Sequence, residues 1–149
     1  SSWRLAARID EAGRLIWRGL PFVVASGARA RRVTEISLAP GAAVLMRETV
    51  VLGRHGEKGG DVRSDTRIEL EDHPVLLERL EVDAAIPQIG VLGTNRVIDS
   101  VIAVGYRPPS AAGALILETP GAIARHLSRD AHNSGLDEVW ESWHAALTH

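Results

Sequence analysis

Residues 62–70 read Val-Arg-Ser-Asp-Thr-Arg-Ile-Glu-Leu, and this stretch decides the fold class. Every second side chain, beginning with Val62, is apolar or carries only a hydroxyl group. The side chains between them, from Arg63 to Glu69, are charged and alternate in sign. A side-chain period of two is the pattern of a β-strand with one face against a core and the other in water. The sequence therefore predicts a half-buried strand at residues 62–70.

Short strands are expected on both sides of this stretch. Asp72-His73-Pro74 predicts a turn into a strand at residues 75–82, so that the two strands form an antiparallel hairpin. Ala39-Pro40-Gly41 predicts another turn, before an apolar strand at residues 43–52. Further strands are predicted at residues 3–8, 14–18, 20–25, 32–38, 97–104 and 114–117. The prediction is a mainly β domain that is rich in strands over residues 1–118.

Residues 119–149 have a different character. Thr119 and Pro120 are typical of an N-cap and a first-turn proline, which predicts a helix to about residue 131. Asn133 and Ser134 can cap a second helix. An apolar stripe then recurs at helical spacing, made of Leu136, Val139, Trp140, Trp143 and Leu147. Because no linker or fixed-period repeat interrupts the chain, we expect one domain over residues 1–149 that ends in two α-helices.

Trp140 and Trp143 allow two interpretations. In the first, their rings anchor the last helix to the strands. In the second, they lie partly exposed in a contact with another protein, because Trp is enriched in protein interfaces.

The composition excludes several classes of function. Lysine and arginine number 17 against 19 acidic residues, which is not the basic excess of a nucleic-acid-binding protein. The chain has no cysteine, which excludes disulfides, cysteine-ligated zinc, iron–sulfur clusters and thiol nucleophiles. We find no apolar run long enough to span a bilayer and no signal-peptide pattern, so we expect a cytoplasmic protein.

Residues 53–60, Gly-Arg-His-Gly-Glu-Lys-Gly-Gly, are the one stretch that looks like a site. A phosphate-binding loop would need a hydroxyl residue after Lys58, where this chain has Gly59. His55 and Glu57 match half of a zinc-deaminase motif, whose paired cysteines are missing. The stretch is then either a flexible hairpin connection, or a charged turn that contacts a partner or lets a divalent cation pass.

Glu48 stands in an otherwise apolar strand just before this loop. A buried carboxylate without a partner would be too costly to keep ionised. We therefore expect Glu48 either to pair with an arginine such as Arg54 or to face a wet channel.

No pattern in the sequence predicts catalysis. The six histidines make no i, i+4 pair, and the serine-hydrolase and zinc-protease motifs are absent. Two alternatives remain open. A β-rich module for a small molecule or carbohydrate would need exposed aromatics, and the chain has one Tyr and one Phe. A hydrolase could use His55 as base and Glu57 as orienting acid, but it would also need a placed nucleophile.

Four stretches resemble the UreD family of urease accessory proteins. Residues 38–57, Leu-Ala-Pro-Gly-Ala-Ala-Val-Leu-Met-Arg-Glu-Thr-Val-Val-Leu-Gly-Arg-His-Gly-Glu, are similar to its apolar strand, acid and L-G-R…G-E turn. Residues 74–80 resemble the strand that follows in the family. Residues 15–28 resemble a segment that reads L-x-W-x-P-x-P…A in relatives. Residues 123–147 resemble the two closing helices of the family. The likeness is specific over 15–82 and looser over 83–147. The family's first half, with its glycine-rich G-G-x-x-G-G-D stretch, is absent from this chain, and Gly19-Leu20-Pro21 departs from the Pro-x-Pro spacing.

The resemblance implies a mainly β protein in which short strands stack as a right-handed β-helix. It implies binding to UreF, which recruits the GTPase UreG, and docking of the assembly on apo-urease. Nickel would pass transiently along a channel in the UreD subunit, with no catalysis and no tightly bound cofactor.

The resemblance also turns particular residues into candidates. Glu57 is the first expected contact of nickel, with Glu48 and His55 as further candidates. Arg54, Trp140 and Trp143 are the expected partner contacts. If the family's first half normally extends the strand stack, the edge near residues 3–18 is exposed without it, and we expect self-association.

Overall fold

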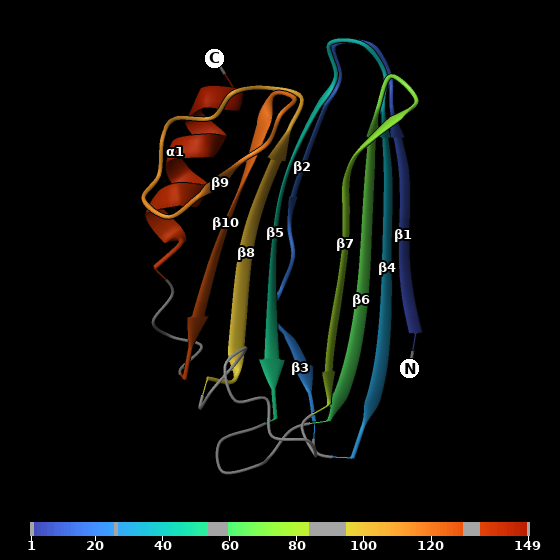
Figure 1. Cartoon of the computed structure of the whole chain (residues 1–149), viewed down its shortest axis with the longest axis vertical. Helices are drawn as coiled ribbons and strands as arrows, with labels where there is room; N and C mark the ends of the chain where they lie inside the picture. The colour runs from blue at the N-terminus through green and yellow to red at the C-terminus, as the bar shows by residue number, and fades with distance from the viewer. Residues whose placement is uncertain (1, 26, 54–59, 84–94, 130–134, 149) are drawn as a thin grey trace.

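The structure is a computed structural model that describes residues 2–25, 27–53, 60–83, 95–129 and 135–148. Two β-sheets face each other, and one helix covers the outer face of the second sheet (Figure 1). The architecture is mainly β, as the alternation in residues 62–70 predicts.

The first sheet, sheet A, has four strands in the order β1-β4-β6-β7. Strands β1, β4 and β6 are parallel to one another, while β7 is antiparallel to β6. The bounds are β1 Ser2–Ile9, β4 Arg29–Leu38, β6 Asp61–Leu70 and β7 His73–Asp83. The predicted hairpin is therefore confirmed, with its turn at Glu71 and Asp72.

The second sheet, sheet B, has the order β2-β5-β8-β10-β9, and β3 also pairs with β5. Strands β2 and β3 are parallel to β5, while the pairs β5–β8, β8–β10 and β10–β9 are antiparallel. The bounds are β2 Arg14–Arg18, β3 Phe22–Val24, β5 Ala43–Leu52, β8 Val97–Val104, β9 Leu115–Ile116 and β10 Gly121–Ser128.

The parallel neighbours arise because the chain crosses repeatedly between the sheets. From β1 it enters sheet B as β2 and β3, returns as β4, and crosses again as β5 before β6. The alternation stops at β7, which stays in sheet A beside β6. The structure thus confirms the mainly β class.

The prediction of a helix from Pro120 to about residue 131 is wrong, because β10 occupies most of this stretch. Ile123 and Leu127 are four residues apart, and this even spacing places them on one face of a strand as well as on one face of a helix. Pairing with β8 over its whole length decides between the two. A Cβ at Gly121 would lie 2.5 Å from the carbonyl oxygen of Ala103, so glycine allows this close pairing.

The predicted last helix is confirmed as α1, Asp137–Leu147, although Asn133 and Ser134, its expected caps, lie outside the described residues. It has 11 residues, and within the described ranges no helix is long and apolar enough to cross a membrane.

Two apolar clusters fill the space between the sheets, one toward each end of the strands. The cluster near the turns that follow β4 and β6 includes Ile36, Met46, Ile68 and Ile102. The cluster at the opposite end is made of Val24, Ala30, Val50, Leu52, Val62, Val82 and Ile98. A third cluster lies between the outer face of sheet B and α1.

Candidate functional site

Polar side chains separate the two apolar clusters between the sheets. Along these strands, the side chains that point into the space between the sheets are aliphatic toward both ends and polar in the middle. On β5, for example, Glu48 stands between Met46 of one cluster and Val50 of the other. We call this set the polar band, and it consists of Arg32, Thr34, Glu48, Ser64, Thr66, Glu78, Ser100 and Arg125.

Strand register places the members of the polar band in rows across the sheets. In sheet A, Thr34 pairs with Thr66, and Thr66 pairs with Glu78. In sheet B, Glu48 pairs with Ser100, and Ser100 pairs with Arg125. Each row runs perpendicular to its strands, so the polar band crosses the sandwich from side to side.

Arg32 and Glu48 form the buried part of the polar band. Their side chains are 8% and 11% exposed, and Arg32 Nη2 lies 3.5 Å from Glu48 Oε1. The guanidinium carbon of Arg32 also lies 4.9 Å from the centre of the Trp3 ring and 5.0 Å from that of Phe22. Two cation–π contacts and burial therefore hold Arg32 in place.

Arg125 and Glu78 form the accessible part. Arg125 donates hydrogen bonds from both terminal nitrogens to the Glu78 carboxylate, and its Nε donates to Ser100 Oγ at 3.0 Å. The two side chains are 37% and 28% exposed. This pair joins β10 of sheet B to β7 of sheet A at a point that water reaches.

A small cavity lies inside the polar band. Its volume is about 20 Å³, roughly enough for one water molecule. Polar side chains line much of it: Glu48, Ser64, Thr66, Glu78, Ser100 and Arg125. Among the described residues, Thr34 Oγ1 and Arg32 Nη1 are buried and have no hydrogen-bond partner. The polar band therefore holds hydrogen-bonding capacity that the described side chains do not use.

The pKa of Glu48 is raised above its usual value. Burial raises it most, and the nearby Glu78 carboxylate raises it further, while Arg32 and Arg125 oppose both effects. The buried Glu48 carboxyl therefore keeps its proton to a higher pH than an exposed glutamate does.

The cavity combines carboxylate and hydroxyl oxygens with one guanidinium group, that of Arg125. Carboxylate and hydroxyl oxygens are hard donors. Within the described ranges, no three His, Asp or Glu side chains are grouped so that they could hold a metal ion.

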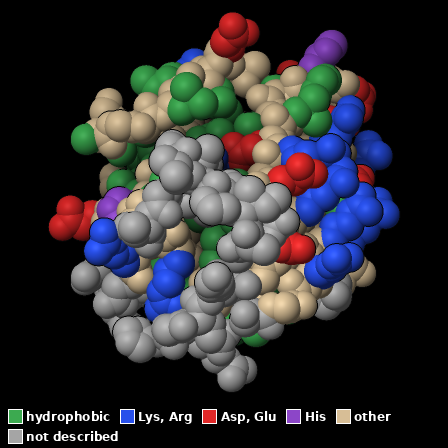
Figure 2. All heavy atoms as spheres, turned by 60° about the horizontal axis from the view of Figure 1, so that its bottom comes forward, with side chains coloured by type: hydrophobic (Ala, Val, Ile, Leu, Met, Phe, Trp, Pro, Cys, Tyr) green, Lys and Arg blue, Asp and Glu red, His purple; other side chains and the backbone are tan. Residues whose placement is uncertain are grey.

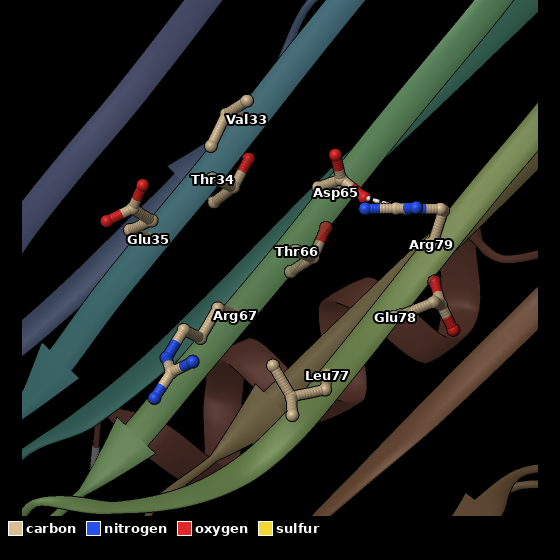
Figure 3. Close-up of a pocket in the computed structure, with 9 residues that line it drawn as sticks. All are labelled: Val33, Thr34, Glu35, Asp65, Thr66, Arg67, Leu77, Glu78 and Arg79. Atoms are coloured by element: carbon tan, nitrogen blue, oxygen red, sulfur yellow. Dashed lines mark hydrogen bonds and ion pairs between the residues drawn. The ribbon is translucent and has the colours of Figure 1, made fainter.

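A second hollow, a groove of about 370 Å³, lies over strands β4, β6 and β7 of sheet A (Figure 3). Arg79 Nε donates to Asp65 Oδ1 at 2.7 Å, and this bond is the main reason why the pKa of Asp65 is lowered. Among the residues that the structure describes, those that line the groove include no aromatic side chain. Figure 2 shows basic side chains gathered on the flank that carries β1 and β4.

The structure places the sequence-predicted residues in three different settings. Glu48 lies in the polar band and pairs with Arg32, so the expected arginine partner is present. Arg54, His55 and Glu57 lie outside the described residues. Trp140 and Trp143 are 4% and 1% exposed in the cluster beneath α1.

The surroundings of the two tryptophans support their role as anchors. Trp143 Nε1 donates to the carbonyl oxygen of Pro109 at 3.0 Å, and the Tyr106 hydroxyl donates to the carbonyl oxygen of Trp143 at 2.9 Å. The contact of Trp140 and Trp143 with a partner protein stays a prediction.

Sequence reasoning missed Arg32, Glu78, Ser100 and Arg125. Glu78 could have been found, because it interrupts the apolar positions of the stretch Val-Leu-Leu-Glu-Arg-Leu at residues 75–80. Arg125 was hidden by the wrong helix prediction, since only the strand conformation turns it inward beside Ser100.

Comparison with known proteins gives one consistent family. The family model described as UreD urease accessory protein matches residues 1–148. Urease accessory protein UreD 1 of Streptomyces griseus is 44% identical over 155 residues, which cover 100% of this chain and 61% of that protein. UreD proteins of Parafrankia sp. and Frankia casuarinae are 33% and 31% identical, covering 83% and 91% of this chain and 41% and 47% of their own lengths.

The chain thus spans about three fifths or less of the length of these relatives. The shared description is that of an accessory protein and not of an enzyme, in agreement with the expectation from the sequence. On the match over residues 1–148 and the 44% identity, this chain belongs to the UreD family of urease accessory proteins.

Proposed function

We propose that the protein acts in urease maturation, as a scaffold that delivers nickel to apo-urease. In this proposal it binds UreF, which brings the GTPase UreG, and nickel ions pass through the polar band. We also propose that the strands, which cross repeatedly between the two sheets, form part of a right-handed β-helical stack. One observation carries the nickel route: the Glu48 carboxylate is buried between the sheets beside a small cavity with a largely polar lining.

The chemistry of the polar band supports transient binding. A cargo ion must be released again, so a closed cage of imidazole or thiolate ligands would hold it too tightly. Glu48 and Glu78 supply negative charge, while Ser64, Thr66 and Ser100 supply neutral oxygen donors along the same cavity.

The shape of the interior favours a route across the strands. Toward Gly53 and Gly60, which flank the charged loop, the apolar cluster around Val50 and Ile98 closes the space between the sheets. The polar rows, in contrast, run from Arg125 on one side of the sandwich toward Arg32 on the other. Glu57 and His55 remain proposed nickel contacts, and Arg54 a proposed partner contact, at the strand ends.

Nickel content of urease tests this proposal. The full-length protein carrying Glu48→Gln is co-expressed with urease and the other accessory proteins, and nickel per urease active site is measured. We expect less nickel than with the unchanged protein, while binding to UreF is retained. Glu35→Gln is the matched control, because Glu35 pairs with Arg4 on the outer face of sheet A. Equal nickel content for Glu48→Gln at matched expression would refute the route through the polar band.

A further inference from the structure

The two sheets differ in what covers their outer faces. Helix α1 lies over sheet B, whereas no element in the described part of the chain lies over the outer face of sheet A (Figure 1). Glu35 is the one acidic residue at the outward positions of β1 and β4. This flank is therefore positive in a chain whose formal net charge is −2 (Figure 2). The same positions carry four exposed arginines, which we call the arginine patch: Arg4, Arg8, Arg29 and Arg31.

Two members of the arginine patch have no acidic partner. Among the described residues, neither Arg8 nor Arg31 forms an ion pair or a side-chain hydrogen bond. Strand register pairs Arg8 with Ser37, and it pairs Arg31 with Ser2 on one side and with Arg63 on the other. Like charges at paired positions of neighbouring strands repel each other. Arg31 therefore stands where it does nothing for the stability of sheet A.

The other half of the same face is different. The outward arginines of β6 and β7 are all paired with acids: Arg63 with Asp65 at 3.3 Å, Arg67 with Glu69 at 2.6 Å, and Arg79 with Asp65 at 2.7 Å. Sheet A thus compensates its arginines over β6 and β7 and leaves positive charge over β1 and β4. An uncompensated patch of one sign attracts a surface of the opposite sign.

An apolar contact surface adjoins the arginine patch. The groove over β4, β6 and β7 is lined by Val33 and Leu77, and Leu77 is 65% exposed (Figure 3). Strand register pairs Arg4 with Val33, while Arg31 and Arg8 lie toward the two ends of the groove. A large exposed apolar side chain in a hollow can receive an apolar side chain of another protein. The outer face of sheet A therefore offers an apolar contact with positive charge along one side.

We propose that the arginine patch and the groove form one docking surface, for a partner protein that presents carboxylates beside an exposed apolar side chain. The planar guanidinium group matches a carboxylate with two parallel hydrogen bonds, and arginine is enriched in protein interfaces. A nucleic acid fits less well, because Asp65 and Glu69 on the same face would repel its phosphates. The inference rests on the proposed function only for the choice of proteins that test it.

Binding of the full-length protein to purified UreF and to purified apo-urease tests the surface. We expect Arg31→Glu to bind one of these two proteins at least about tenfold more weakly than the unchanged protein does. Binding of that partner to the unchanged protein should also weaken between about 50 mM and about 300 mM salt. Arg107→Glu is the control with the same change of charge, because Arg107 lies before β9 at the far side of sheet B. Equal binding of both partners by Arg31→Glu and the unchanged protein would overturn the proposal.

The groove is tested by a second pair of variants. Leu77→Ser should weaken binding of the same partner. Leu20→Ser is the control, because Leu20 is an exposed leucine of sheet B, between β2 and β3. A loss that is equal for the two leucine variants would contradict a contact at the groove.

Thermal unfolding separates docking from a structural role of Arg31. Arg31→Glu should melt no lower than the unchanged protein, because it replaces a repulsive pairing with Arg63 by an attractive one. A lower melting temperature would show that Arg31 supports the sheet, which contradicts the proposal.

The docking surface and the proposed function fail in different measurements. If UreF or apo-urease binds Arg31→Glu and the unchanged protein equally well, the proposed function stands and the docking surface is wrong. If neither protein binds the unchanged protein, the proposed function is wrong, and a synthetic peptide Glu-Asp-Leu-Asp-Glu decides on the surface. The unchanged protein should bind this peptide more tightly than Arg31→Glu does, and equal affinities would overturn the proposal. Binding of a DNA oligonucleotide that depends on Arg31, with no effect on either protein partner, would also overturn it.

Discussion

The guanidinium group of Arg47 and the carboxylate of Asp99 meet in a two-bond pair on the outer face of sheet B, with distances of 3.2 Å from Nε and 2.8 Å from Nη2. Their side chains are only 7% and 3% exposed. Arg47 Nη1 also lies 2.7 Å from Asp137 Oδ1, in the first turn of α1. Arg47 therefore links two central strands to the helix that covers them.

Breaking this pair should destabilise the fold. Asp99→Ala leaves the buried Arg47 without its main partner, and removing one member of a buried pair typically costs about 3–5 kcal/mol. Asp137→Ala is the control, because the Asp137 side chain is 67% exposed and its loss should cost roughly 0–1 kcal/mol. Urea unfolding of both variants checks the difference. Equal destabilisation by the two would contradict a dominant Arg47–Asp99 pair.

The turn between β6 and β7 is strained. Glu71 and Asp72 have φ angles of 52° and 65°, and together they form a two-residue hairpin connection. Such turns prefer Asn followed by Gly, because other side chains disfavour positive φ. Combining Glu71→Asn with Asp72→Gly should stabilise the protein by about 1 kcal/mol, seen as a higher urea midpoint.

Glu81→Gly is the control for the turn. Glu81 lies within β7, where glycine should destabilise by roughly 0.5–1 kcal/mol. If the double change at the turn also lowers the midpoint, relief of backbone strain is not the dominant effect there.

Trp143 should matter more for stability than any exposed residue of α1. Trp143→Ala removes a side chain that is 1% exposed, which should cost about 3–5 kcal/mol. Trp143→Phe keeps most of the packing and loses the hydrogen bond to Pro109, so about 1 kcal/mol is expected. Thermal unfolding measures the loss of stability in each variant. Pull-down of UreF by the folded Trp143→Phe variant separately tests whether Trp143 contacts a partner protein. A Trp143→Ala variant that melts like the unchanged protein would refute the anchor role.

The outermost strands predict self-association of the 149-residue chain. In the described part of the chain, β1 ends sheet A and β2 ends sheet B, so each has one backbone edge without a neighbouring strand. Unprotected edges recruit other chains. Light scattering should show an average mass that rises over a tenfold range of concentration, and a constant monomer mass would count against this expectation.

The sequence predicted strands well where one face is buried and the other is wet. In β6, charge alternation makes the period of two visible directly. In β10 the inner face mixes Ile123 and Leu127 with Arg125, while small Ala122 and Ala124 lie under α1, so no alternation of polarity was available. Pairing with the neighbouring strand β8 decides whether such a stretch forms a helix or a strand. This pairing cannot be read from the residues of the stretch itself.

The candidate site shows the same limit. Glu48 was recognised because a carboxylate in an apolar strand needs a partner or water, and this argument uses one strand alone. The rest of the polar band depends on register between strands, as in the pairing of Glu48 with Ser100 and of Ser100 with Arg125. No spacing along the chain encodes these distances, so the sequence predicted an arginine partner for Glu48 but did not identify Arg32 as that partner.

Glu48 also predicts how stability depends on pH. Burial raises the pKa of its carboxyl in the folded protein above the unfolded value of about 4.5. Between these two pKa values the folded state binds a proton that the unfolded state has lost, so stability falls as pH rises through this window.

Glu48→Gln mimics the protonated acid. Its stability should match that of the unchanged protein near pH 4 and exceed it increasingly as pH rises above about 4.5. Urea unfolding at several pH values up to 7.5 measures the difference. Asp65→Asn is the control, because the pKa of Asp65 is lowered from 3.8 and its contribution is therefore constant at pH values well above 3.8. A stability difference for Glu48→Gln that shrinks with rising pH would show that Arg32, and not burial, dominates the ionisation of Glu48.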